Sequence, residues 1–179
     1  MRTRALVAAP VAIACLMAAP AGAQQVTKET IPGIVNFARV ETTVACGGST
    51  KPEAVAEIKK LGFASIINLR LPEEREANID AEAAAAKAAG IKFVHLPFNG
   101  TTPDPAVAAK FLDEITTPGT QPAYIHCGGG NRAAAMWLIK RIAVDHWEVD
   151  RATQEATALG MTSPALKQFA IDYAQSHKR

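Results

Sequence analysis

The stretch that most constrains the fold is 124–137, which reads Tyr-Ile-His-Cys-Gly-Gly-Gly-Asn-Arg-Ala-Ala-Ala-Met-Trp. The apolar run from Ala123 to Ile125 predicts the end of a buried strand, and the residues from Ala133 onward are good helix formers. Three consecutive glycines between them predict a tight loop whose backbone can approach a ligand closely. Because a loop that opens a helix presents free N–H groups and a positive dipole end, this stretch predicts an anion-binding strand–loop–helix unit.

Two side chains give this loop a chemistry. Cationic surroundings favour the thiolate form of a cysteine, which is its nucleophilic form, and Cys127 lies at the start of the loop. Arg132 adds a planar, permanently charged group that suits phosphate. We therefore expect Cys127 to be a nucleophile inside an oxyanion cradle. The backbone of the cradle would be formed by Gly128, Gly129, Gly130 and Asn131.

Short apolar segments alternate with helical patterns along the rest of the chain. Strands are predicted within 35–44 and at 64–69, 91–96 and 123–125, and helices at 50–62, 72–89, after an N-cap at Asp104, and at 133–144, 149–159 and 163–175. This alternation predicts a single α/β domain with a small, mostly parallel sheet of four to five strands flanked by helices. Ligands of such sheets bind at the carboxyl ends of the strands, which is where Cys127 falls.

The N-terminal residues predict export. A basic start, an apolar run from Ala5 to Ala19 and small residues before Gln24 are typical of a secretory signal peptide over residues 1–23. The run is too short to span a bilayer, so no stable membrane insertion is expected after cleavage at Ala23. The predicted location is periplasmic or secreted. Lipidation at Cys15 is an alternative that the preceding residues fit poorly. Residues 24–33 are polar and predict a flexible segment.

Charge gives no reason to expect a nucleic-acid partner. The chain has 19 basic and 17 acidic residues, but Arg2 and Arg4 belong to the predicted signal peptide. The mature chain therefore has a net charge near zero, without the strong basic excess that binds nucleic acid or anionic membranes. His126 has no partner at metal-ligand spacing, and we expect neither a metal nor another cofactor.

Removal of the signal peptide leaves two cysteines, Cys46 and Cys127. In an exported protein they could form a structural disulfide, which is the main alternative to a catalytic thiol. If both lie near the cleft, a reversible disulfide could instead mask the nucleophile. Arg70 follows a predicted strand on the same sheet edge and could contact the substrate or only solvent.

The run from His126 to Arg132 resembles the signature of cysteine-dependent protein tyrosine and dual-specificity phosphatases. Five further segments resemble sequence motifs of the bacterial dual-specificity-phosphatase-like group, which includes the beta-lactamase hydrolase-like phosphatase domain. These segments are residues 36–40, 47–49, 66–70, 95–98 and 155–163. The resemblance covers about residues 34–166. It implies a protein tyrosine phosphatase-like fold and a phosphatase-like domain over residues 34–179.

The sequence departs from the common phosphatase pattern in three places. Four residues separate Cys127 from Arg132, where most tyrosine phosphatases have five. Ala133 stands where phosphatases commonly have a Ser or Thr that helps the thiolate to leave. The general acid is usually an Asp in the loop after the strand that ends at Leu96, and here Asp104 is the only carboxylate of that loop. Asp104 also fits a purely structural role as the N-cap of a helix that begins at Pro105.

The resemblance implies an exported phosphatase that hydrolyses a phosphomonoester of a phosphorylated small molecule or protein. Cys127 would form a phosphocysteine, Arg132 and the loop N–H groups would hold the phosphoryl oxygens, and Asp104 would protonate the leaving group. Two alternatives stay open. Cys127 could carry a persulfide in a rhodanese-like sulfurtransferase, a family in which a four-residue gap also occurs, or the domain could be a catalytically inactive anion binder.

Overall fold

The computed structural model describes residues 25–40 and 42–179, and its centre is a six-stranded sheet in the order β1-β2-β3-β6-β4-β5. The strands are β1 (Val26–Lys28), β2 (Ala38–Val40), β3 (Val44–Gly47), β4 (Ser65–Asn68), β5 (Lys92–His95) and β6 (Ala123–His126). The strands β3, β6, β4 and β5 are parallel to one another. At one edge of the sheet, β2 pairs antiparallel with β3, and β1 pairs antiparallel with β2. The predicted signal peptide, residues 1–23, lies outside the described residues.

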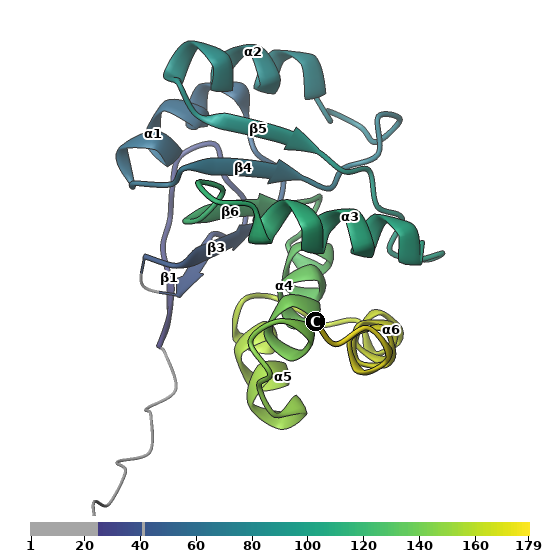
Figure 1. Ribbon diagram of the computed structural model, residues 1–179. Coiled ribbons are helices and arrows are strands. Elements are labelled where there is room, and N and C mark those ends of the chain that lie inside the picture. The colour runs from purple at the N-terminus through teal and green to yellow at the C-terminus, as the bar shows by residue number, and fades with distance from the viewer. Residues whose placement is uncertain (1–24, 41) are drawn as a thin grey trace, which may run out of the picture.

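Helices cover both faces of the sheet, as the α/β prediction requires (Figure 1). They are the short η1 (Pro52–Ala54), α1 (Val55–Lys60), α2 (Ile79–Ala89), α3 (Pro105–Thr116), α4 (Asn131–Ala143), α5 (Val149–Ala158) and α6 (Pro164–Ser176). One core cluster lies under α1 and α2, and a larger one fills the opposite side against α3 to α6. The single α/β domain predicted from the sequence is confirmed.

Helix α4 is the central element of the larger core. Every residue from Ala133 to Ala143 is buried, because α3, α5, α6 and the sheet surround the helix. Met136, Trp137 and Ile139 are fully buried in this core. Trp137 buries its indole and still satisfies it, since Nε1 donates a hydrogen bond of 2.7 Å to a carboxylate oxygen of Glu155. The helix that begins at the loop is thus held firmly in place.

The sheet has six strands, whereas the sequence predicts four or five. The additional strand is β1, which lies in the segment 24–33 that the sequence predicts to be flexible. Its three residues pair antiparallel with β2, and Glu29 next to it forms an ion pair with Arg39 of that strand. Edge pairing of this kind depends on a partner strand, so it leaves little signal in the local sequence.

The predicted helix over 72–89 begins only at Ile79. The residues before it form turns, because Glu76 and Asn78 adopt left-handed backbone conformations with φ of 57° and 48°. Thr50, at the start of the helix predicted over 50–62, does not cap a helix with its side chain. Its hydroxyl lies 2.7 Å from that of Tyr124 and donates to the carbonyl of Gly48, so it fastens β3 to β6 instead.

Within the part of the chain that the structure describes, no helix is both long enough and apolar enough to cross a bilayer.

Candidate active site

Cys127 lies at the carboxyl ends of three neighbouring parallel strands. His126, the last residue of β6, pairs with Gly47 of β3 on one side and with Asn68 of β4 on the other. The N–H of Cys127 donates a 3.2 Å hydrogen bond to the carbonyl of Gly47, and α4 begins four residues later at Asn131. The strand–loop–helix unit predicted from the sequence is confirmed.

The carbonyl groups of the loop point away from the sulfur. Ser49 donates to the carbonyl of Gly128 through its N–H (2.9 Å) and its hydroxyl (3.3 Å), and the Asn36 amide donates to that of Gly129 (3.2 Å). In a planar trans peptide the N–H points opposite to the C=O, so these bonds turn the N–H groups of the following residues inward. The N–H of Gly130 accordingly donates to Cys127 Sγ at 3.2 Å.

The end of β3 approaches this loop too closely for a side chain. A Cβ atom added at Gly48 would lie 2.8 Å from the carbonyl oxygen of Gly128 and 3.1 Å from that of Val35. Gly130 has a φ of 104°, which a residue with a side chain rarely adopts. Glycine is therefore required at both positions for the loop to keep this shape.

Arg132 is held by four hydrogen bonds. Its Nη1 donates to the carbonyls of Leu69 (3.1 Å) and Phe98 (2.9 Å), and the two Nη atoms grip both carboxylate oxygens of Glu74 at 2.6 and 2.9 Å. A side chain at Gly128 would meet Arg132 Nη2 and a Glu74 oxygen at 3.4 Å each, so this pair lies directly over the loop. Paired donors and acceptors in a plane fix the guanidinium orientation as well as its position.

The interaction between Glu74 and Arg132 favours the charged form of both side chains. Partial burial on its own would raise the pKa of Glu74, but the hydrogen bonds and the charge of Arg132 outweigh it and lower that pKa from 4.5 to about 2. Burial would likewise lower the pKa of Arg132, but the bonds to Glu74 and the neighbouring Cys127 raise it above its ordinary value. Glu74 therefore stays ionised and is unsuited to donate a proton at neutral pH.

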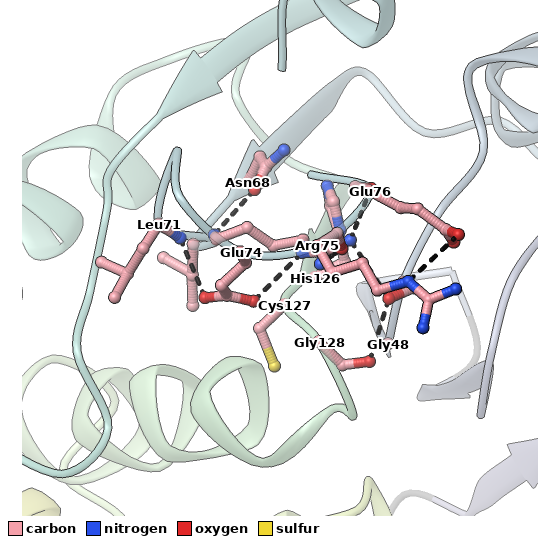
Figure 2. A network of polar contacts seen from close by, with 12 residues as sticks. Gly48, Asn68, Leu71, Glu74, Arg75, Glu76, His126, Cys127 and Gly128 are labelled. Carbon is pink, nitrogen blue, oxygen red and sulfur yellow. Dashed lines mark hydrogen bonds and ion pairs between the residues drawn. The ribbon is translucent and has the colours of Figure 1, made fainter. Parts of the chain in front are cut away.

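The sequence did not indicate Glu74 as a residue of the candidate site. It lies in the turn segment that was predicted as helix, and its carboxylate also accepts from the N–H of Leu71 (2.9 Å) and from Arg70 Nε (3.1 Å). Figure 2 shows this carboxylate between Leu71 and the loop that bears Cys127. The available signal was Pro72 followed by acidic residues and by Asn78, a composition that favours a turn over a continuous helix.

Arg70 occupies the predicted sheet edge but bonds to protein groups. Its side chain is buried and donates to the Ser49 hydroxyl (3.2 Å) and to the carbonyls of Glu76 (2.9 Å) and Arg75 (2.6 Å), in addition to Glu74. These contacts fold the segment that carries Glu74 over the active-site loop. In this structure the hydrogen bonds of Arg70 position the segment that carries Glu74, while the substrate contact considered from the sequence stays a prediction.

Asn131 contributes its backbone to the loop and its side chain to a different contact. The amide donates to the Thr162 hydroxyl at 2.7 Å and accepts from the N–H groups of Thr162 (2.9 Å) and Ser163 (3.1 Å). The turn that opens α6 is therefore fastened to the loop.

Asp104 lies at the N-terminus of α3, as the capping pattern predicts, and its Oδ1 accepts from the N–H of Ala106 at 2.8 Å. A cavity of about 380 Å³ adjoins Arg132, and it does not include Asp104. Its lining residues are Leu71, Glu74, Asn99, Gly100, Thr101, Asn131, Arg132, Ser163 and Leu166. Glu74 is the only carboxylate among these lining residues.

Cys46 lies in the middle of β3, fully buried, and it shares the larger core cluster with Cys127. Burial, together with the nearby charge of Cys127, raises the pKa of the Cys46 thiol well above 9.0. Both thiols are free, so the structural disulfide that the sequence left open is absent between these two residues. Cys46 is therefore a buried thiol in the same core cluster as the candidate nucleophile, and its raised pKa disfavours the thiolate form.

A buried polar group supports the loop from the α2 side of the sheet. His126 Nε2 lies 2.9 Å from one oxygen of Glu82, and the Asn68 amide donates to the other oxygen at 2.7 Å. All three side chains are fully buried. Among residues 25–40 and 42–179, no three His, Cys, Asp or Glu side chains are placed to hold a metal ion.

Two solved structures share this fold, and one of them is described as a phosphatase. The core catalytic domain of the PP-IP phosphatase SIW14 from S. cerevisiae is 21% identical, with a TM-score of 0.65 over 80% of this chain and 88% of that chain. TpbA from P. aeruginosa is 19% identical, with a TM-score of 0.60 over 79% of this chain and 84% of that chain. At this identity the likeness shows the protein tyrosine phosphatase-like fold.

A curated relative, the beta-lactamase hydrolase-like protein of Xylella fastidiosa, is 31% identical over 125 residues. The match covers 68% of this chain and 27% of the relative, so the chain spans about a quarter of that longer protein. Residues 36–144, which include the whole loop from Cys127 to Arg132, match the family described as beta-lactamase hydrolase-like protein, phosphatase-like domain. The chain belongs to this family of phosphatase-like domains.

Proposed function

We propose that this protein is an exported, cysteine-dependent phosphatase that hydrolyses a phosphomonoester through a phosphocysteine intermediate. The observation that carries the proposal is the loop geometry. Cys127 Sγ accepts from the Gly130 N–H while Arg132, fixed by Glu74, stands over the same loop. A thiol surrounded by inward N–H groups and one guanidinium is the arrangement that stabilises both a thiolate and the charge of a phosphoryl group in transfer.

In the first step the Cys127 thiolate attacks phosphorus, and the bond from phosphorus to the leaving oxygen breaks. The loop N–H groups and Arg132 bind the non-bridging oxygens, whose charge they neutralise throughout the transfer. In the second step water attacks phosphorus, which releases inorganic phosphate and restores the thiolate. Cys127 is only 1% exposed, so a phosphoryl group must sit within the loop to reach the sulfur.

The relatives support a phosphorylated substrate. The S. cerevisiae relative is described as a PP-IP phosphatase, a variant of P. aeruginosa TpbA has been solved in complex with phosphotyrosine, and PTPMT1 in complex with PI(5)P. For this chain we propose a phosphorylated small molecule or protein outside the cytoplasm, since residues 1–23 read as an export signal.

The group that protonates the leaving oxygen requires a separate test. Asp104 is the candidate from the sequence, but it caps α3 in this structure, and Glu74 is bound to Arg132. A reaction without a placed acid favours leaving groups that depart as stable anions, such as phenolates, because they need no proton in the transition state. Aryl phosphates are therefore the substrates of choice for detecting the activity.

The decisive experiment compares two buried cysteines. The mature chain should hydrolyse p-nitrophenyl phosphate under reducing conditions, and Cys127→Ser should lower kcat by at least about 10³-fold because the nucleophile is lost. Cys46→Ala, which removes the other buried thiol, should stay within about threefold of wild type. Trapped phosphocysteine in a rapidly quenched reaction would identify the intermediate by mass spectrometry.

Three results would decide against the phosphatase. Turnover that survives Cys127→Ser would exclude the covalent route. Sulfur transfer from thiosulfate to cyanide in excess of phosphate hydrolysis would favour the rhodanese-like alternative. Phosphate-dependent thermal stabilisation without either activity would favour an inactive anion binder.

A further inference from the structure

A second cavity, of about 730 Å³, opens on the other side of the active-site loop. It shares Gly129 and Asn131 with the loop and extends to residues that the phosphatase mechanism does not use. One wall consists of Lys28 in β1 together with Phe37 and Ala38, where the chain enters β2. The turn before α6 supplies the other wall. This volume far exceeds what a phosphoryl group needs and falls in the range of small-molecule sites.

Both walls are fastened to the loop. The Asn36 amide bonds to the carbonyl of Gly129, and the Asn131 amide bonds to Thr162, so each wall is joined to the loop by a side-chain amide. A group bound in this cavity would therefore lie at a fixed offset from Cys127. Preformed geometry of this kind positions a substrate without a further ordering cost.

Lys28 gives the cavity its charge. Lys28 lines it and has no carboxylate partner among residues 25–40 and 42–179. The only acidic residue in the lining, Glu29, is already paired with Arg39. The hydroxyls of Thr30 and Thr162 add polar groups on the same lining, while the half-buried Ile34 provides an apolar part. The lining thus suits a partly apolar group that carries an anion.

We propose that this cavity binds the leaving group of the substrate, and that the preferred leaving group carries a second anionic substituent, which Lys28 binds. The inference rests on the proposed phosphatase function and adds a substrate class to it. Lys28 is a specificity residue in this assignment, since it contacts the part of the substrate that does not react.

The test uses two aryl phosphates of similar size, 4-(carboxymethyl)phenyl phosphate and 4-ethylphenyl phosphate. At low ionic strength the wild type should show a kcat/KM about five- to tenfold higher for the carboxylated substrate, a difference that salt should reduce. Lys28→Ala should bring the ratio close to one, Lys28→Arg should keep it, and the control Lys87→Ala, an exposed lysine on α2, should leave it unchanged.

A binding measurement makes the inference independent of turnover. The corresponding aryl phosphonates, which cannot be hydrolysed, can be titrated calorimetrically into the Cys127→Ser variant. A carboxylate-dependent gain in affinity that disappears with Lys28→Ala supports the assignment. Equal affinity for both phosphonates, or a gain that Lys28→Ala leaves intact, overturns it. If the wild type hydrolyses neither substrate while the phosphonates still show the gain, the proposed activity is wrong and the cavity assignment stands.

Discussion

The two sides of the active-site loop use positive charge in opposite ways. On the side of Arg132, the two Nη atoms are bonded to Glu74 and to two carbonyls, and the adjoining cavity is the smaller one. On the other side, Lys28 faces a cavity about twice as large and has no carboxylate partner among the described residues. A guanidinium paired with a carboxylate of the same protein has a fixed orientation, which catalysis of phosphoryl transfer requires. A lysine without such a partner can bind an anionic group of a ligand and so discriminate between substrates.

The largest effect is expected when the Glu74 carboxylate, which fixes Arg132, is removed. Glu74→Gln keeps the size of the side chain but removes its charge and one half of the paired bonds, so Arg132 should lose its orientation. We expect kcat on p-nitrophenyl phosphate to fall by about 10²-fold with a smaller change in KM, because misplaced electrostatic stabilisation affects the transition state most.

Glu73→Gln is the matched control, since this neighbouring glutamate is exposed. Its kcat should remain within about twofold of wild type. A Glu74→Gln variant with wild-type kcat would show that Arg132 does not depend on the pair.

A smaller effect is expected at Asp104, whose observed bond is that of a helix cap. Asp104→Ala should lower the free energy of unfolding by about 1 kcal/mol and leave kcat for p-nitrophenyl phosphate within about threefold. The measurement is urea denaturation together with kcat for aryl phosphates whose phenols span a range of acidity. A loss of more than about tenfold that grows as the phenol becomes less acidic would make Asp104 the general acid after all, and it would place a proton donor on the Arg132 side.

The last expected effect, similar in size to the loss of stability at Asp104, concerns stability in acid. The pKa of Glu74 is lowered from 4.5 to about 2 in the folded protein, so its contribution is complete above pH 4.5 and is lost as the pH falls towards 2. Wild type should therefore exceed Glu74→Gln in stability at pH 6, by about 1 kcal/mol after allowance for solvent screening, and the difference should shrink by pH 3. Urea denaturation at both pH values measures it, and a difference that stays constant would contradict the assigned pKa.

The sequence predicts the elements that local chemistry determines. The glycine run, Cys127 and Arg132 lie within one short stretch, and the Asp104-Pro105 cap is a two-residue signal, so both are predicted in their observed places. The alternation of strands and helices likewise gives the correct fold class. The strands β3, β4 and β6 are buried along their whole length, as parallel strands covered on both faces are.

What the sequence misses depends on partners that are distant along the chain. Glu74 reads as a surface helix residue, and its role exists only because Arg132, 58 residues later, faces it. The sequence places Arg70 at the correct edge of the sheet but does not indicate its acceptors. Two of them are carbonyls of an irregular turn, and the others are the side chains of Ser49 and Glu74. Strand β1 requires a partner strand before it can be recognised.

The hydrogen bonds on the outward carbonyls of the loop have a consequence for protein engineering. Asn36 and Ser49, which lie 93 and 79 residues before their acceptors, hold Gly129 and Gly128, and Gly48 allows the close approach. A graft of residues 126–132 alone onto another scaffold would transfer the thiol and the guanidinium but not the bonds that turn the N–H groups inward. A functional graft would also have to include a second segment of the chain, made up of the end of β3 and the turn that bears Asn36.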